Sequence, residues 1–270
     1  MIASLKDLEG KEIESFELPS VFETPFRREV IKKVYVNVLS AKFQPQGRYP
    51  AAGEMVSAES RNTGLGIARI ARARGEGFQR AGQAAGVASV RSGRLAHPPV
   101  SWKKNQKKIN KKEKQLGLFS AIAATSKKEI MESRGHKLGK MSEFPIVVSN
   151  ELEKITKTSD LRKTLVSLGL EEDLARSNNI VRVRSGKSRM RGRKRLSALS
   201  CLIVVSKGSP VGKLKSSLPG VNVVSIENLS IMDLVPGTKP VRLALYTKNA
   251  IDYMHNMKTA WSRVKDMVKQ

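Results

Sequence analysis

Pro145-Ile-Val-Val-Ser149 is the stretch that decides the fold. It is a short continuous apolar run, which is typical of a buried strand in a parallel sheet. Three further mainly apolar stretches that are typical of strands follow along the chain, at residues 202–205, 221–225 and 241–246, and helical patterns separate them. Strands that alternate with helices at this spacing predict an α/β fold, in which helices flank a mainly parallel sheet.

Hairpin and helix patterns account for most of the remaining chain. Residues 2–18 are typical of a hairpin that turns at Glu9-Gly10-Lys11. Apolar residues at helical spacing predict helices at about 26–41, 127–134, 150–156, 159–168, 171–178, after Pro210, 229–234 and 247–268. We therefore expect a single α/β domain over residues 1–270, interrupted by a long extended loop at about 43–100.

The loop between Gln44 and Pro99 contains neither a convincing strand nor an amphipathic helix. Structureless loops longer than about 12–15 residues are uncommon in compact domains unless they are functional or disordered. Arginine suits bidentate phosphate contacts and stacking on bases, and glycine permits close backbone approach. Glycines are scattered through the loop, and its basic residues are all arginine: Arg48, Arg61, Arg69, Arg72, Arg74, Arg80, Arg91 and Arg94. The loop is therefore predicted to bind nucleic acid.

The charge of the chain is large and unevenly placed. Fifty Lys and Arg residues against 24 Asp and Glu residues give a formal net charge of +26. Residues 48–114 contain fifteen basic and four acidic residues, and residues 182–195 contain eight basic residues and no acidic one. Charge concentrated in this way indicates a binding surface for a polyanion.

A lysine-rich segment follows the loop and begins near Trp102. On a helix its lysines would form two adjacent rows at i, i+4 and i+8, so we expect a cationic helix face that continues into an apolar helix ending near Ala124. Its candidate RNA-binding residues are Lys103, Lys104, Lys107, Lys108 and Lys111.

The second basic segment interleaves charge with Gly186 and Gly192, as expected of backbone laid on phosphates. Its candidate RNA-binding residues are Arg182, Arg184, Lys187, Arg189, Arg191, Arg193, Lys194 and Arg195. A solvated helix face or a nuclear targeting signal would also be basic. The division into an arginine-only loop and a lysine-only segment favours nucleic acid. RNA is preferred because flexible arginine-rich segments often follow irregular RNA, and no DNA-binding motif is visible.

Motifs for nucleotide or metal chemistry are incomplete. Gly186-Lys187-Ser188 is no phosphate loop, because the glycine required four residues earlier is replaced by Val181. The histidines, His97, His136 and His255, lack metal-ligand spacing. Cys201 lies within an apolar run, which predicts a buried thiol. We predict no catalytic residue, metal or cofactor, although an enzyme on the α/β scaffold remains an alternative.

Membrane and export signals are also missing from the sequence. No apolar run approaches 18 residues, and the first residues lack the apolar core of a signal peptide. We expect a soluble cytoplasmic protein without a membrane partner.

Three stretches together resemble the family of the fourth protein of the large ribosomal subunit: Phe43-Gln-Pro-Gln-Gly-Arg-Tyr-Pro50, Arg91-Ser-Gly-Arg-Leu-Ala-His-Pro-Pro99 and Arg184-Ser-Gly-Lys-Ser-Arg-Met-Arg-Gly-Arg-Lys-Arg195. The similarity runs along essentially the whole chain. It looks closest to the archaeal form, since the long C-terminal extension of eukaryotic members is lacking. The resemblance implies a structural protein of the ribosome that binds 23S-type ribosomal RNA, aids subunit assembly and contacts neighbouring ribosomal proteins.

The resemblance also implies a role for the loop. In this family the loop tip helps to form the narrow part of the polypeptide exit tunnel, near the nascent chain. We place the tunnel-facing tip in the stretch most distant in sequence from both loop ends, with Gly64, Gly66, Arg69, Arg72, Arg74, Gly75 and Gly77. The alternative is a free regulatory RNA-binding protein that acts on messenger RNA.

Overall fold

The computed structural model describes residues 1–139, 141, 143–214 and 217–256. They divide into two compact units. The first unit comprises residues 1–39 together with the described residues from 108 onward, and the second unit comprises residues 40–107.

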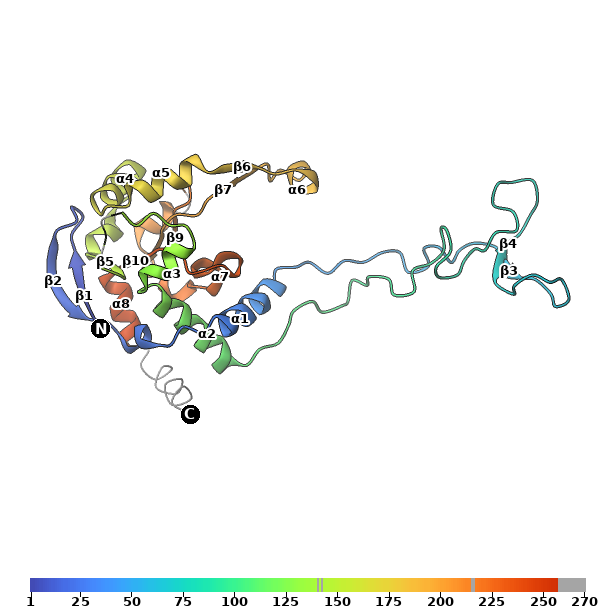
Figure 1. Ribbon diagram of the computed structural model, residues 1–270, viewed down its shortest axis with the longest axis horizontal. Helices are drawn as coiled ribbons and strands as arrows, with labels where there is room; N and C mark the ends of the chain where they lie inside the picture. Colours follow the sequence, from blue (N-terminus) through green and yellow to red (C-terminus); the bar gives the residue numbers. More distant parts are fainter. Residues whose placement is uncertain (140, 142, 215–216, 257–270) are drawn as a thin grey trace. The chain divides into compact units, whose positions relative to one another are not determined.

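The first unit is built on a six-stranded sheet with the order β2-β1-β5-β10-β8-β9 (Figure 1). Its strands are β1 (Ile2–Lys6), β2 (Glu12–Glu17), β5 (Ile146–Val148), β8 (Leu202–Val205), β9 (Asn222–Ser225) and β10 (Ala244–Thr247). Strands β1, β5, β10, β8 and β9 pair in parallel, whereas β2 pairs antiparallel with β1. The predicted α/β class is confirmed, and the N-terminal hairpin makes the sheet mixed.

Helices cover both faces of this sheet. Val147, Val204 and Tyr246 face one core, which also takes side chains from η1 (Ser20–Glu23), α1 (Arg28–Ser40), α2 (Lys111–Ala124), α7 (Ile231–Leu234) and α8 (Lys248–Asn256). Their strand neighbours Ile146, Ile203 and Leu245 face a second core with α3 (Lys128–Ser133), η2 (Asn150–Lys154), α4 (Thr158–Ser167), α5 (Glu171–Asn179) and η3 (Pro210–Leu214). Because side chains alternate along a strand, each continuous apolar run is buried on both faces.

Most predicted helices are present, with two changes of type. The stretches near 150–156 and after Pro210 are the 3₁₀ helices η2 and η3, and two further ones are η4 (Ile226–Asn228) and η5 (Pro236–Thr238). The helix predicted over 247–268 is α8 as far as Asn256, and the rest of that prediction lies outside the described residues.

The lysine-rich helix face was predicted wrongly. Four of its lysines lie in irregular backbone before α2, which begins only at Lys111: Lys103, Lys104, Lys107 and Lys108. A longer helix would stack like charges at i, i+4 and crowd them at the positive amino end of the helix dipole. No acidic residue precedes Glu113 to offset that repulsion, since the segment from Trp102 to Lys112 has none.

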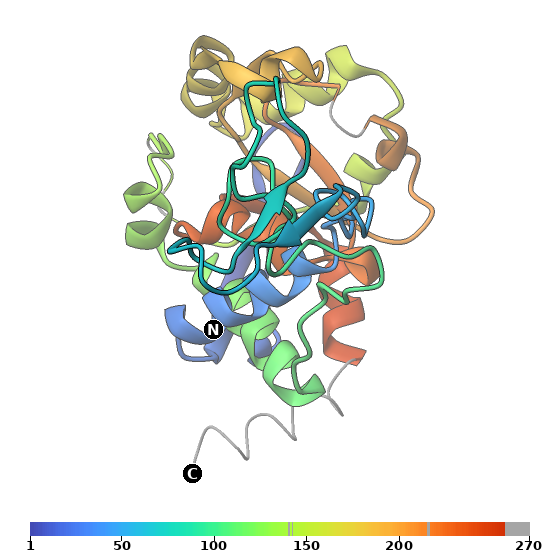
Figure 2. The same ribbon diagram turned by 90° about the vertical axis from the view of Figure 1, so that its right-hand side faces the viewer.

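The second unit contains two strands, so the expectation that residues 44–99 lack strands was wrong. Strand β3 (Ala58–Ser60) pairs antiparallel with β4 (Ala71–Ala73), and the two lie side by side as teal arrows in Figure 2. Glu59 is opposite Arg72, which also forms a bridge with Ala84. Strands this short carry no alternation pattern that a sequence can reveal, because recognition needs about 4–8 residues.

Candidate nucleic-acid interface

The second basic segment forms a hairpin on the first unit. Strand β6 (Val181–Val183) pairs antiparallel with β7 (Arg195–Ser197), and the short helix α6 (Gly186–Met190) lies in the connection (Figure 1). Gly186 and Gly192 have φ angles of 64° and 79°, a left-handed conformation that other residues rarely adopt. The glycines in this segment therefore shape the tip of the hairpin.

The cations of this hairpin are not neutralised by the described part of the chain. Arg184 is half-buried, and the other seven basic residues are exposed. None of the eight side chains forms a hydrogen bond or ion pair with a described residue. The structure thus brings all eight candidates together on one protruding hairpin, where they present a concentrated positive surface to solvent.

Four of the candidate arginines of the second unit have partners within that unit. Arg48 Nη2 donates to the carbonyl of Ala52 at 2.6 Å, and Arg72 Nη1 donates to the carbonyl of Gly82 at 2.9 Å. The other two form ion pairs, Arg74 with Glu59 and Arg94 with Glu54. These arginines help to hold the irregular backbone of the second unit together.

The other four arginines of the second unit are exposed and have no side-chain partner among the described residues: Arg61, Arg69, Arg80 and Arg91. The candidate lysines before and at the start of α2 are exposed as well. Glu113, the acid of the first turn of α2, is paired with Lys33 at 2.5 Å. Both units therefore carry exposed cations suited to phosphate.

The candidate tip residues lie on two loops that flank β4. Gly64, Gly66 and Arg69 belong to the connection from β3 to β4, and Arg74, Gly75 and Gly77 belong to the loop that follows β4. All four of these glycines have positive φ angles and are exposed. Arg72 lies within β4 itself and is half-buried. The second loop is closed by a hydrogen bond of 2.9 Å from Ala73 N to Gln83 O.

A buried polar network was not predicted from the sequence. Asp173, in the first turn of α5, accepts hydrogen bonds from His136 Nδ1 (3.1 Å), Arg176 Nε (2.9 Å) and Ser200 Oγ (2.7 Å). The other nitrogen of His136 accepts from the backbone N–H of Leu243 at 3.3 Å. The network therefore ties α5 and the segment after α3 to the backbone that leads into β8 and β10.

Burial and hydrogen bonding set the protonation of this pair. Burial lowers the pKa of His136 and outweighs the opposing hydrogen bond to Asp173. Burial alone would raise the pKa of Asp173, but the hydrogen bonds from His136, Arg176 and Ser200 hold it well below its usual range. At neutral pH the pair is a neutral imidazole that donates to a carboxylate. Its side chains are fully buried, which fits a role in stability.

The carboxyl ends of the parallel strands are filled by the chain itself. This edge of an α/β sheet is where ligands usually bind. Here Glu153 accepts hydrogen bonds from Ser206 Oγ after β8 (2.6 Å), Thr247 Oγ1 of β10 (2.7 Å) and Asn249 Nδ2 of α8 (3.2 Å). Burial raises the pKa of Glu153, but these hydrogen bonds outweigh it, so the net shift is downward. An anionic side chain occupying this edge disfavours a nucleotide there.

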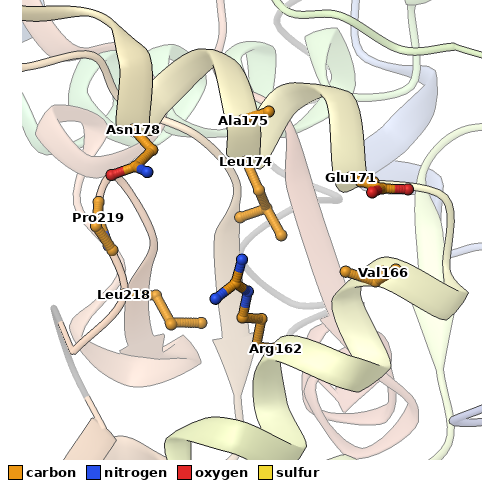
Figure 3. Close-up of a pocket in the computed structure, with 8 residues that line it drawn as sticks. All are labelled: Arg162, Val166, Glu171, Leu174, Ala175, Asn178, Leu218 and Pro219. Carbon is orange, nitrogen blue, oxygen red and sulfur yellow. The ribbon is translucent and has the colours of Figure 1, made fainter.

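A pocket of about 260 Å³ lies between α4, α5 and the segment around Leu218. Figure 3 shows the Arg162 guanidinium reaching between Leu174 and Leu218, with Glu171 on the opposite side of the pocket from Leu218. Its described lining contains no serine, cysteine or histidine. The side chains seen there therefore provide no pair of nucleophile and base.

Neither a membrane-spanning helix nor a metal-binding cluster is present within the described ranges. Over residues 1–139, 141, 143–214 and 217–256, no helix combines the length and apolar character needed to cross a bilayer. The same residues contain no cluster of three or more His, Cys, Asp or Glu side chains able to hold a metal ion.

Comparisons with known proteins identify the family. A model described as "Ribosomal protein L4/L1 family" matches residues 16–257. Large ribosomal subunit protein uL4 of Sulfolobus acidocaldarius is 40% identical over 252 residues, which are 93% of this chain and 92% of the relative. Its namesakes are 39% identical in Sulfurisphaera tokodaii (92% of this chain, 91% of the relative) and 37% identical in Methanopyrus kandleri (94% and 98%). The resemblance inferred from the sequence is confirmed, and the chain belongs to the ribosomal protein L4/L1 family.

Proposed function

We propose that this protein is a structural constituent of the large ribosomal subunit and binds 23S-type ribosomal RNA. The observation that carries the proposal is the similarity to proteins named large ribosomal subunit protein uL4, which covers more than nine-tenths of each chain. The exposed cations without partners on both units support an RNA partner. The protein would then reside in the cytoplasm on the ribosome, beside other large-subunit proteins, and would have no catalytic activity.

The proposed mechanism is electrostatic and architectural. The helix-flanked sheet is a folded anchor, and the cations neutralise phosphates of RNA segments that must lie close together. Arginines bridge phosphates or stack on bases, and lysines act as point charges. Neutralised phosphates release counterions, so binding to free RNA should weaken steeply as salt rises. The RNA-binding residues are those of the loop, the lysine-rich segment and the β6–β7 hairpin.

The second unit is proposed to be the extended arginine- and glycine-rich loop of the family, inserted into a single α/β domain. Its sequence at residues 43–50 and 91–99 carries the resemblance, and its exposed tip glycines suit close packing against a partner. The tip would help to line the polypeptide exit tunnel and contact the nascent chain. A photo-crosslinking side chain in place of Leu65 should then label a stalled nascent peptide, whereas labelling of RNA alone would contradict the tunnel placement.

The assignment to the ribosome is tested by sedimentation of a native cell extract. The protein should co-migrate with the large subunit on a sucrose gradient and remain there through a wash at moderate salt. Accumulation in the light fractions at normal expression would instead favour a free regulator of messenger RNA.

A further inference from the structure

A second pocket lies in the first unit, beside the lysine-rich start of α2. It has a volume of about 450 Å³ and lies between α1, α2 and the segment that runs from η4 into α7. Pockets for small organic ligands typically have volumes of about 300–1,000 Å³. The space is therefore large enough to admit one nucleotide.

The walls of this pocket are largely apolar. Val34, Leu229 and Ile231 line it and are themselves buried, and Val38 and Leu118 line it with half-buried side chains. Such a surface is favourable for a flat, weakly solvated group such as the face of a nucleobase. Gln115, also in the lining, adds an exposed amide that can pair with a base edge.

The rim of the pocket is cationic. Lys111 and Lys114 line it from one turn of α2, and both are exposed without an ion pair to any described residue. The acid in the lining, Glu227, is paired with Lys207 at 3.0 Å. The net charge at the opening is therefore positive, which favours an occupant that joins an apolar ring to phosphates over an uncharged peptide.

We propose that this pocket holds one unstacked nucleotide of the ribosomal RNA. Its base packs on Val38 and Leu118, and the phosphates on either side of it contact Lys111 and Lys114. The base must come from a loop or bulge, because bases in a paired and stacked helix are not free to enter. This inference rests on the proposed RNA-binding function and adds the kind of nucleotide that this face of the protein recognises.

The test uses variants that fill the pocket without changing charge. Val38→Trp occupies the space for the base, and Val36→Trp is its control, since Val36 is exposed on the same helix and does not line the pocket. Gln115→Trp fills the pocket from an exposed position on α2, and serves if Val38→Trp fails to fold. The full-length proteins are titrated with deproteinised large-subunit RNA at several salt concentrations.

Loss of a packed base should weaken binding about tenfold at every salt concentration and leave the slope of log affinity against log salt unchanged. A second pair of substitutions, Lys111→Gln with Lys114→Gln, should instead reduce that slope. Equal affinities for Val38→Trp and Val36→Trp would overturn the pocket assignment, as would a loss confined to low salt. A wild-type protein that bound no RNA would overturn the proposed function itself, and the pocket with it.

Discussion

At the scale of single residues, the Asp173 carboxylate is the polar group on which several segments depend. It is fully buried, and His136, Arg176 and Ser200 donate to it. Asp173→Asn removes the charge and turns one acceptor into a donor that faces other donors. We expect the free energy of unfolding to fall by about 3–5 kcal/mol, measured by urea denaturation. Glu172→Gln, at the exposed neighbouring position, should change it by less than about 0.5 kcal/mol.

The same network predicts how stability depends on pH. Burial lowers the pKa of His136, so the folded protein keeps the ring neutral, whereas the unfolded chain takes up a proton below about pH 6.5. The unfolded state then binds more protons, so this stability is fully present above about pH 6.5 and is lost as the pH falls toward the folded pKa. Asp173, whose pKa is also lowered, adds a further loss below about pH 4.

Unfolding measured from about pH 7 to about pH 5 should therefore show decreasing stability in the wild type and a flatter profile in His136→Asn. The variant Asn178→Ala changes an exposed residue that carries no titrating group and should keep the wild-type slope. A wild-type profile that is flat, or that rises toward pH 5, would contradict a neutral buried His136.

At the scale of elements, α1 and α2 approach closely at Gly117. A methyl group on Gly117 would lie 2.7 Å from Val34 Cγ2, and Val34 is itself buried. Alanine in a helix is usually more stable than glycine by about 1 kcal/mol. Here we expect Gly117→Ala to lower the free energy of unfolding by about 1–3 kcal/mol, because the clash forces the helices apart.

A double-mutant cycle separates the clash from the other effects of Gly117→Ala. Val34→Ala alone leaves a cavity, but it also removes the atom that the new methyl group would strike. The double variant should be more stable than the sum of the two single changes predicts. Strict additivity in urea denaturation would show that the two helices do not meet at this pair.

The β6–β7 hairpin should act as a separate RNA-binding element. Three of its side chains, those of Arg189, Arg191 and Arg193, are exposed and have no described partner. Changing all three to Gln should therefore leave the free energy of unfolding nearly unchanged. Each lost phosphate contact should reduce the slope of log affinity for RNA against log salt concentration by about one. A charge-matched control variant changes three other exposed residues to Gln: Lys154, Lys157 and Lys163. This variant should keep the wild-type slope.

Sequence reasoning succeeded for elements whose signal is local. The apolar runs at 145–149, 202–205, 221–225 and 241–246 correspond to β5, β8, β9 and β10. Their order in the sheet could not be predicted, because β10 is the last of the described strands along the chain yet lies between β5 and β8. The order of the strands in the sheet depends on packing between segments that are far apart in the sequence. The three-residue strands of the β6–β7 hairpin were missed for lack of any periodic pattern.

The sequence predicted which residues of the candidate interface are cationic, but it predicted less well which of them have partners within the protein. A run of basic residues interleaved with glycine indicated exposed cations on the hairpin, and its side chains are exposed apart from half-buried Arg184. Partners such as Glu59 for Arg74 depend on a register that no local pattern gives. One signal for buried polar groups was available: Arg242 interrupts an apolar run, and its guanidinium donates to the carbonyls of Ser200 and Cys201.

At the scale of the whole molecule, the net charge of +26 opposes folding when no polyanion is present. Salt screens this repulsion, so the melting temperature should rise between about 0.02 M and about 0.5 M potassium chloride. The hairpin variant with three arginines changed to Gln should show a weaker dependence. Thermal unfolding followed by circular dichroism measures the melting temperatures of the wild type and of the variant. A wild-type melting temperature that falls as salt rises would show that attractive ion pairs dominate instead.

The strand order also dictates when this protein can fold during its own synthesis. Leu5 of β1 pairs with Val147 of β5, so the whole second unit is translated before this pairing is possible. The centre of the sheet stays open still longer, until β10 emerges and joins β5 to β8. At about 5–20 residues per second, the most cationic stretches therefore spend from a few seconds to a few tens of seconds outside a completed fold. Nucleic acid near the translating ribosome can reach these stretches during that interval. The synthesis of β10, the last of the described strands, therefore sets the time at which the sheet can close and the cationic chain can complete its fold.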